Sequence, residues 1–403
     1  MLGEYSLNII IHRGTHQIGG CVTEICTKKT HIFIDMGSEL PDEDGNIAIE
    51  TLSIDGVTGG SKSCDGVLFT HYHGDHIGML AHILPGVPLY MGQAAKDIFL
   101  TLQKRVNCTL VPAVEAINTF RATDKIQIGD IAITPLMVDH SAYDAYMFLI
   151  EADGKRVLHT GDFRTHGFRG KGVIPMLKKY VGQVDVLITE GTMLSRDASH
   201  IDTERELQEK AKKLLSDNKY VFVICSSTNI DRLASLHEAT PRGKYFLCDS
   251  YQKDVIDIAV KYGGMHAQLY TFKKAKVYKE YFEEKAEKQG FCMMVRANDC
   301  FLNIMRKYRD NHNSECLVIY SLWDGYLQLP NNRLAPLMEG FQQVKHLHTS
   351  GHATLEAIVE VCNTVKPLQA IIPIHSTNST MLDRLNLPYH IEYLADAQVY
   401  EVK

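Results

Sequence analysis

One loop restricts the folds open to this chain more than any other stretch. The sequence LFTHYHGDHIG, residues 68–78, places His71, His73, Asp75 and His76 within six positions, directly after an apolar run. Packing alone does not explain the run, because these four side chains are costly to remove from water and lie side by side. The loop therefore predicts a metal site at the end of a buried strand.

The spacing within the loop favours two metal ions over one. His71 and His73 are two positions apart, so their side chains point the same way at an extended strand end. Gly74 then lets the backbone turn freely before Asp75 and His76. A catalytic ion takes about four ligands and keeps one position open for water. The loop can thus direct two ligands toward one ion and two toward an adjacent ion.

Three further candidate ligands follow apolar runs elsewhere in the chain. His140 comes after IAITPLMV, Asp162 after KRVLH and His375 after AIIPI. In an α/β fold, the carboxyl ends of several strands supply one site. Imidazole and carboxylate without thiolate suit Zn²⁺, with Mn²⁺ or iron as alternatives. Two such ions about 3.5–4 Å apart activate a water for hydrolysis, and phosphodiesters are natural substrates for that chemistry.

The order of the apolar runs predicts an α/β protein whose rhythm changes in the middle. Up to about residue 184, short β-branched runs alternate with Gly and Asp turns, as in strands covered on both faces. Beyond that point strands and helices alternate, which is typical of a parallel α/β unit. Residues 203–217 and 229–239 are expected helices, the second with Asn229 as N-cap. Residues 272–288 are expected to form one charged helix.

Composition bears on location and partners. The chain of 403 residues has a net charge of −6, which does not suggest a nucleic-acid binder as a whole, although residues 191–345 are its more basic part. It has no run of roughly 20 apolar residues, and its N-terminus resembles a first strand rather than a signal peptide. The ten cysteines are scattered without a C-x-x-C pair. We expect a cytoplasmic protein with no membrane partner.

These motifs together resemble the metallo-β-lactamase superfamily. THYHGDHIG resembles its H-x-H-x-D-H motif, and FIDMG, DHS and HTGDF resemble its other motifs in the family's order. The resemblance implies an α/β fold, an αββα sandwich. It also implies that one ion is held by His71, His73 and His140, that a second is held by Asp75, His76 and His375, that Asp162 bridges them, and that Asp35 is a buried support of the loop.

The second half of the chain resembles the β-CASP nucleases of that superfamily. ITEGT, HTSGHA and PIHS resemble motifs A, B and C and place Glu190, His352 and His375 in those roles. The resemblance implies a β-CASP α/β domain inserted into the lactamase fold. The implied boundaries are 1–195 and 346–403 for the two parts of the metallo-β-lactamase domain, and 196–345 for the β-CASP domain.

Two stretches resemble the ribonuclease J branch in particular. SSTNIDR resembles its Ser-Asn-x-x-Arg stretch, with Thr228 where the pattern has Ser, and HLHTSGHA carries its H-x-S-G-H pattern. PIHS replaces the more usual PVHGE. The chain is expected to end with the lactamase part, without the separate C-terminal domain of full-length ribonuclease J. The resemblance implies a substrate phosphate bound by His348, Ser350, His352, Asn229 and Arg232.

The resemblance predicts a ribonuclease that uses two divalent ions, Zn²⁺ first and Mn²⁺ as the alternative, on single-stranded RNA. Asp75 would orient or deprotonate the water, His352 would act as general acid, and Glu190 would hold its ring. Exonuclease and endonuclease modes and a homo-oligomer stay open. The alternatives are an ester, thioester or lactone hydrolase, a β-CASP nuclease acting on DNA, and a degenerate subunit that only binds RNA.

Overall fold

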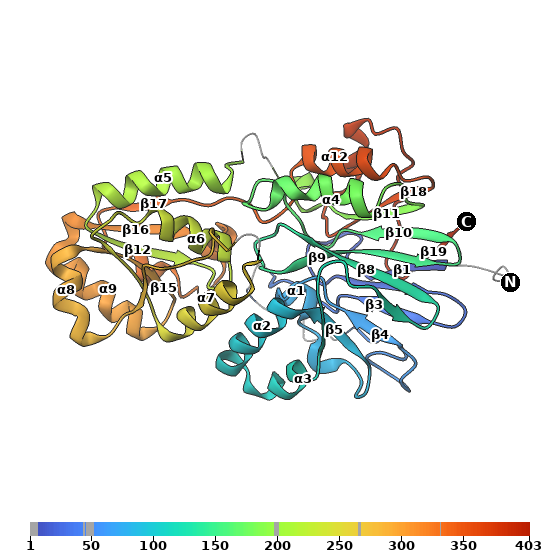
Figure 1. Cartoon of the computed structure of the whole chain (residues 1–403), viewed down its shortest axis with the longest axis horizontal. Helices are drawn as coiled ribbons and strands as arrows, with labels where there is room; N and C mark the ends of the chain where they lie inside the picture. The colour runs from blue at the N-terminus through green and yellow to red at the C-terminus, as the bar shows by residue number, and fades with distance from the viewer. Residues whose placement is uncertain (1–6, 43–44, 46–51, 197–200, 265–266, 331) are drawn as a thin grey trace.

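Three β-sheets form the framework of the computed structural model, which describes residues 7–42, 45, 52–196, 201–264, 267–330 and 332–403. Two sheets face each other on the right of Figure 1, and the third lies on the left with its own helices. The two facing sheets contain the start and the end of the chain, whereas the third is built from its middle.

The first facing sheet places Asp35 beside the loop that follows residue 68. Because β3 and β4 pair in parallel, the segments after both strands emerge at one edge. The strands β19, β1, β2 and β3 pair in antiparallel fashion. In order, the sheet consists of β19 (Val399–Val402), β1 (Leu7–Arg13), β2 (Val22–Cys26), β3 (His31–Ile34), β4 (Gly66–Leu68), β5 (Leu89–Gly92) and β6 (Asn118–Phe120).

The second facing sheet carries the remaining candidate ligands at the ends of three parallel strands. Asp162 follows β10, Glu190 ends β11 and His375 directly follows β18. These three strands are neighbours, so their carboxyl ends lie together. In order, the sheet consists of β18 (Ala370–Ile374), β11 (Val186–Glu190), β10 (Lys155–His159), β9 (Ala145–Ala152), β8 (Ile131–Val138) and β7 (Ile126–Ile128).

Helices cover the outer face of each facing sheet. Between the sheets lies a core of aliphatic residues that includes Ile9, Ile34 and Ile188. Helices α4 (Val173–Tyr180) and α12 (Leu355–Val365) pack on the outer face of the second sheet, and α2 (Gln93–Val106) packs on that of the first. The predicted αββα sandwich is therefore confirmed. Within the described residues, no helix has both the length and the apolar character needed to cross a membrane.

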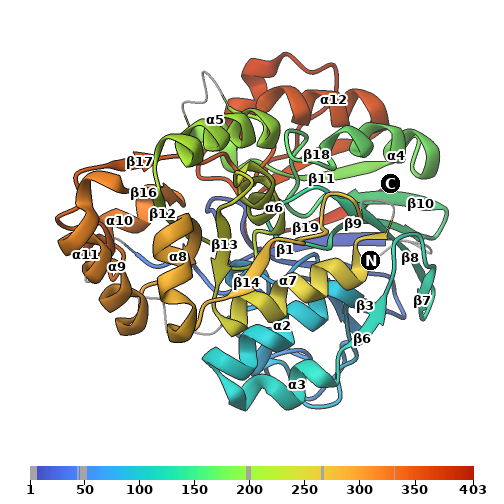
Figure 2. The same ribbon diagram turned by 60° about the vertical axis from the view of Figure 1, so that its left-hand side comes forward.

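The third sheet is entirely parallel and has helices on both faces (Figure 2). In order, it consists of β14 (Ala275–Val277), β13 (Tyr245–Cys248), β15 (Phe291–Val295), β12 (Tyr220–Cys225), β16 (Cys316–Ser321) and β17 (Val344–His346). One face packs against α5 (Glu204–Asp217), α6 (Ile230–Ala239) and α7 (Ser250–Tyr262), and the other against α8 (Glu283–Gln289), α9 (Asp299–His312) and α11 (Ala335–Met338).

Two of the three helices expected in this region are confirmed and one is wrong. Helix α5 begins with a capping box at Thr203, and the Asn229 side chain caps α6 by accepting from Arg232 N. Residues 272–288 do not form one helix. Their first part contains β14, which pairs with β13, and helical structure begins only with a 3-10 turn at Glu280–Phe282 that leads into α8.

Candidate metal centre

The ligand loop joins β4 to the short helix α1 (Gly74–Ile77) and is held through its backbone. Met36 N donates a hydrogen bond to His76 O at 2.8 Å, and Cys21 N donates one to Asp75 O at 3.0 Å. These bonds tie the loop to the segment after β3 and to the residue before β2. The loop is therefore a rigid part of the sheet edge rather than a free surface loop.

Asp35 lies beneath this loop and is fully buried. Its backbone is left-handed, with φ at 61°, and its carboxylate accepts three hydrogen bonds of 2.7 Å. The donors are Thr70 N, Thr70 Oγ1 and His76 Nδ1. Because Asp35 holds Nδ1 of His76, the other ring nitrogen, Nε2, faces the remaining candidate ligands. Asp35 itself contacts the cluster only through His76 and Thr70.

The carboxylate of Asp162 lies at the centre of the candidate ligands. Its Oδ2 is 3.2 Å from His76 Nε2 and 3.9 Å from Nε2 of His71 and of His140. The same oxygen is 4.0 Å from His375 Nε2. One carboxylate oxygen thus faces four histidines from three different segments of the chain.

The candidate ligands form two groups around Asp162. We call His71, His73 and His140 the trihistidine half, and Asp75, His76 and His375 the carboxylate half. In the first, the ligand atoms lie within 4.8 Å of one another, and His140 Nε2 is 3.3 Å from His73 Nδ1. In the second, His375 Nε2 is 3.2 Å from Asp75 Oδ2. The structure thus brings all the ligands predicted from the sequence into one cluster.

Protein oxygens hold the outer nitrogens of these rings. His71 Nδ1 is 3.0 Å from Thr70 Oγ1, His375 Nδ1 is 2.7 Å from Thr192 Oγ1, and His140 Nδ1 is 2.6 Å from Gly351 O. Such partners are typical of metal-bound histidines, because they fix the ring and its tautomer.

Two of the inward-facing nitrogens lack a hydrogen-bond partner. Nε2 of His71 and Nε2 of His76 are both buried without one, although the latter faces Asp162 Oδ2 at 3.2 Å. An orphaned buried polar atom such as His71 Nε2 is costly in a protein interior. A divalent cation at the centre would satisfy it, so the residues present fit a bound metal.

The trihistidine half is neutral near pH 7. Burial lowers the pKa of His71 and of His140 well below the usual value, and lowers that of His73 to about 4. Neighbouring rings add to the effect on His71, because three charged imidazoles would repel one another. Neutral imidazole is the form that binds a metal.

The carboxylate half is charged. Burial alone would lower the pKa of His76 and of His375, but nearby carboxylates, Asp162 foremost, raise both well above the usual value. Burial likewise opposes ionisation of Asp75, yet the charges of His76 and His375 hold its pKa below the usual value. Before an ion binds, this half therefore consists of paired charges.

A carboxylate–histidine pair lies beside the cluster. His352 Nδ1 is 3.0 Å from Glu190 Oε2 and 3.5 Å from Asp162 Oδ2. Glu190 also accepts hydrogen bonds from Phe163 N and Ala353 N, which fixes its carboxylate. The His352 side chain is 20% exposed, so a molecule in solution can reach it. Glu190 thus holds Nδ1 of His352, which leaves Nε2 of the ring available to a ligand.

The residues expected to bind phosphate are not all at this site. Ser350 lies in the same loop as His352 and accepts a hydrogen bond from its backbone N at 3.0 Å. His348 is partly buried, its Nδ1 has no hydrogen-bond partner, and burial lowers its pKa to about 3. His348 is therefore uncharged near pH 7 and cannot act as a cation toward phosphate.

Arg232 and Asn229, also expected to bind phosphate, have side chains that make contacts within the protein. Arg232 is fully buried, and its Nε donates to Glu204 Oε1 at 3.0 Å, so its charge is already paired in the interior. The Asn229 side chain is used as the cap of α6. Arg232 thus stabilises the packing of α6 against α5, and Asn229 stabilises the start of α6. The adjacent Asp231 accepts from Arg164 at 3.1 Å, which ties α6 to the second sheet.

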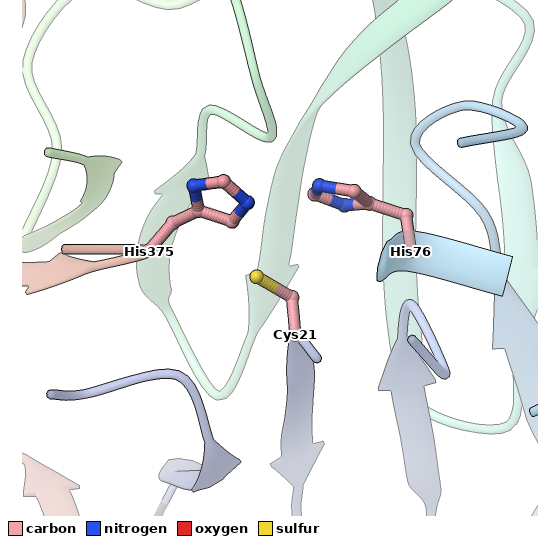
Figure 3. A group of neighbouring side chains, drawn as sticks. All are labelled: Cys21, His76 and His375. Carbon is pink, nitrogen blue, oxygen red and sulfur yellow. The ribbon is translucent and has the colours of Figure 1, made fainter. Parts of the chain in front are cut away.

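Three residues at the centre were missed in the sequence. Thr70 and Thr192 hold His71 and His375, and they lie at the ends of the quoted stretches THYHGDHIG and ITEGT, which is the signal that points to them. Cys21 was one of the ten scattered cysteines, none of which was given a role at the site. Its sulfur instead groups with ring nitrogens of His76 and His375 (Figure 3). A cysteine next to Gly20 rather than within an apolar run was the weak sign of this.

Comparisons with known proteins agree with this fold. Residues 57–222 match the family model of the β-lactamase superfamily domain. A solved structure, a protein of unknown function from Enterococcus faecalis V583, aligns with a TM-score of 0.76 at 21% identity, covering 98% of this chain and 100% of that one. The chain thus shares its fold with that structure, and residues 57–222 are similar to the β-lactamase superfamily domain.

The chain is also similar to proteins named ribonuclease J. The one from Mycoplasma genitalium is 22% identical over 93% of this chain and 68% of its own length. The one from Helicobacter pylori strain J99 is 23% identical over 90% of this chain and 54% of its own length. The one from Sinorhizobium meliloti is 25% identical over 51% and 37%. The alignments thus span about one third to two thirds of these relatives.

Proposed function

We propose that this protein hydrolyses RNA phosphodiester bonds with two divalent ions held by the trihistidine and carboxylate halves and bridged by Asp162. The observation that carries the proposal is the Glu190–His352 pair. His352 Nδ1 lies 3.0 Å from Glu190 Oε2 and 3.5 Å from Asp162 Oδ2. A hydrolase of this chemistry needs a proton donor beside its metals, and this pair is placed to be one. The names of its relatives support RNA as the substrate class.

The proposed reaction divides the work among the chain's own residues. Two bound ions would offset the charge of the phosphodiester and supply a water activated near neutral pH, Zn²⁺ or Mn²⁺ being suited to these ligands. Asp75, partly exposed at the edge of the cluster, would orient that water or take its proton. Glu190 would keep the His352 ring in one tautomer, so that His352 can protonate the leaving oxygen.

Domain organisation supports a polymeric substrate. We propose that residues 1–195 and 346–403 form the metallo-β-lactamase domain and that 196–345 form an inserted β-CASP domain. In support, the strands of the third sheet pair only with one another in the described part of the chain. The insert would border the centre on one side, leaving room for a single strand of RNA.

Exposed aromatic rings near the centre support binding of single-stranded RNA. Trp323 is 47% exposed and Tyr326 45%, and their rings meet edge to face at 5.7 Å. The Arg196 guanidinium lies 5.1 Å over the Trp323 ring, and it interacts electrostatically with Glu190. Tyr326 interacts in the same way with Asp75. Bases would stack on these rings, and Arg196 would face the backbone. We propose that the substrate in the cell is cytoplasmic RNA. The ten cysteines are all free, which is consistent with a reducing compartment.

One assay tests the function. The purified protein, loaded with Zn²⁺ or with Mn²⁺, is incubated with 5′-monophosphorylated RNA, 5′-triphosphorylated RNA, single-stranded DNA and a thioester. We expect cleavage of RNA, and stepwise release of mononucleotides from the monophosphate alone would indicate an exonuclease. Cleavage of DNA in preference to RNA would identify a DNA nuclease. Turnover of the thioester without cleavage of any polymer would refute the proposal.

A matched pair of variants links the activity to the centre. His76→Ala is expected to abolish cleavage while the protein stays folded at the assay temperature, as judged by circular dichroism. His82→Ala is the control, because His82 is an exposed histidine shortly after the loop. Full activity of His76→Ala, or equal loss in both variants, would contradict the assignment.

A further inference from the structure

Cys21 directs a buried thiol at the carboxylate half of the centre. Its sulfur and ring nitrogens of His76 and His375 lie within 4.8 Å of one another. Figure 3 shows the three side chains converging from separate segments, with the sulfur below the gap between the two rings. Cys21 is only 2% exposed, and both histidines are 1% exposed.

Backbone bonds fix the position of this thiol. Cys21 N donates to Asp75 O at 3.0 Å, and Gly37 N donates to Cys21 O at 3.0 Å. On a third side, Gly14 has φ at 115°, and a Cβ there would lie 3.6 Å from the sulfur. Cys21 is thus held to the helix that carries Asp75 and His76, so the sulfur has little freedom to turn elsewhere.

The surroundings of Cys21 differ from those of an ordinary core cysteine. Cys362, for example, is buried among apolar residues of α12 and its neighbours. Cys21 instead faces two imidazoles, of which His76 has its Nε2 buried at 3.2 Å from Asp162 Oδ2. Packing does not require a thiol beside two imidazoles, whereas a shared metal ion would bond the sulfur and both rings.

We infer that Cys21 is a further ligand of the ion in the carboxylate half, giving that ion a sulfur donor in addition to Asp75, His76 and His375. This inference rests on the metal centre of the proposed function. On binding, the thiol would release its proton to water and the thiolate sulfur would bond the ion. Thiolate is a soft ligand that favours Zn²⁺ or Co²⁺ over Mn²⁺. The two halves would then differ in metal preference.

Cobalt loading of the full chain tests the inference without any RNA. A thiolate bound to Co²⁺ gives a ligand-to-metal charge-transfer band in the near ultraviolet, which imidazole and carboxylate ligands lack. We expect the band in the wild-type protein and its loss in Cys21→Ser. Cys26→Ser is the matched control, because Cys26 groups with Glu24 and His31 in a second cluster of possible ligands. Loss of the band in Cys26→Ser but not in Cys21→Ser would overturn the inference.

Metal affinities give a second readout. Cys21→Ser is expected to lower the Zn²⁺ affinity of the carboxylate half by at least about tenfold and to leave its Mn²⁺ affinity nearly unchanged. If Cys21→Ser does not fold, zinc X-ray absorption of the Cys26→Ser protein decides, with a sulfur expected about 2.3 Å from the metal. An absent sulfur would refute the inference. A sulfur signal in a protein that cleaves no RNA would refute only the proposed function.

Discussion

The trihistidine half and the carboxylate half face the same Asp162 oxygen, yet they carry different charges before an ion binds. Burial governs the first, where it lowers the pKa of all three rings. Neighbouring carboxylates govern the second, where they raise the pKa of His76 and His375. Burial acts on the rings of both halves, so the difference in charge between the halves comes from the carboxylates near each ring.

This contrast has a consequence for metal loading. An ion that enters the trihistidine half meets neutral rings and displaces no proton. An ion that enters the carboxylate half must displace the protons that His76 and His375 share with Asp75 and Asp162. The trihistidine half should therefore be filled first, and the carboxylate half should respond to pH.

Replacing the shared carboxylate removes both halves at once. Asp162→Asn deletes the charge that faces His76 at 3.2 Å and His71, His140 and His375 at 3.9 to 4.0 Å. We expect a loss of RNA cleavage of at least about a hundredfold and of both ions after dialysis. Metal content by mass spectrometry and the cleavage rate check this. Asp75→Asn is the control and should release only one ion; two ions retained in Asp162→Asn would contradict the bridging role.

The pH dependence of metal affinity separates the halves directly. His375→Ala leaves the trihistidine half, and His71→Ala leaves the carboxylate half. Between about pH 6 and 8, Zn²⁺ affinity of the first variant should hardly change, because its rings are already neutral. Affinity of the second should rise with pH, by up to about tenfold per pH unit for each proton displaced. Competition with a chelating dye measures both, and equal slopes would refute the difference in charge.

Much of the fold was predictable because it depends on local patterns. Apolar runs predicted the strands that are buried on both faces, and the cap residue Asn229 marked the start of α6. The prediction of one helix over 272–288 was wrong, because β14 forms there through backbone hydrogen bonds to β13. Those bonds depend on a partner strand far along the chain, and helical periodicity does not reveal it.

The site was predictable where ligands follow strands in motifs, and unpredictable where distant packing decides. His71, His73, Asp75 and His76 lie in one loop, so spacing alone predicts a metal cluster. The pattern around Arg232 suggested phosphate binding, but Glu204, contributed by a different helix, already neutralises its charge. Such a pair depends on tertiary contacts that a short motif does not contain.

Acid stability distinguishes the halves in the metal-free protein. His73 has a pKa of about 4 when folded and near 6.5 when unfolded, so only the unfolded chain takes up its proton between these values. The free energy of unfolding should therefore fall as pH decreases from 6.5 to 4. In His73→Gln this fall should be smaller by about 1–3 kcal/mol, measured by urea denaturation with EDTA.

The carboxylate half should show the opposite sign. His76 has a raised pKa in the folded protein, so its contribution is complete below the unfolded value of 6.5 and is lost as pH rises above it. His76→Gln should therefore be less stable than the wild type at acid pH, and this difference should shrink as the pH rises. The stability of His73→Gln relative to the wild type should instead improve as the pH falls toward 4. Parallel curves for the two variants would show that both halves carry the same charge.

The smallest expected effect comes from the threonines that hold the outer ring nitrogens. Thr192→Val removes the 2.7 Å partner of His375 Nδ1 while keeping the shape of the side chain. We expect Zn²⁺ affinity to fall about tenfold in the carboxylate half alone, because the ring loses its fixed tautomer. Thr70→Val is the matched change, but Thr70 also donates to Asp35, which holds His76. Thr70→Val should therefore lower the Zn²⁺ affinity of both halves. If Thr192→Val also lowered the affinity of both halves equally, the threonine at His375 would not act on the carboxylate half alone.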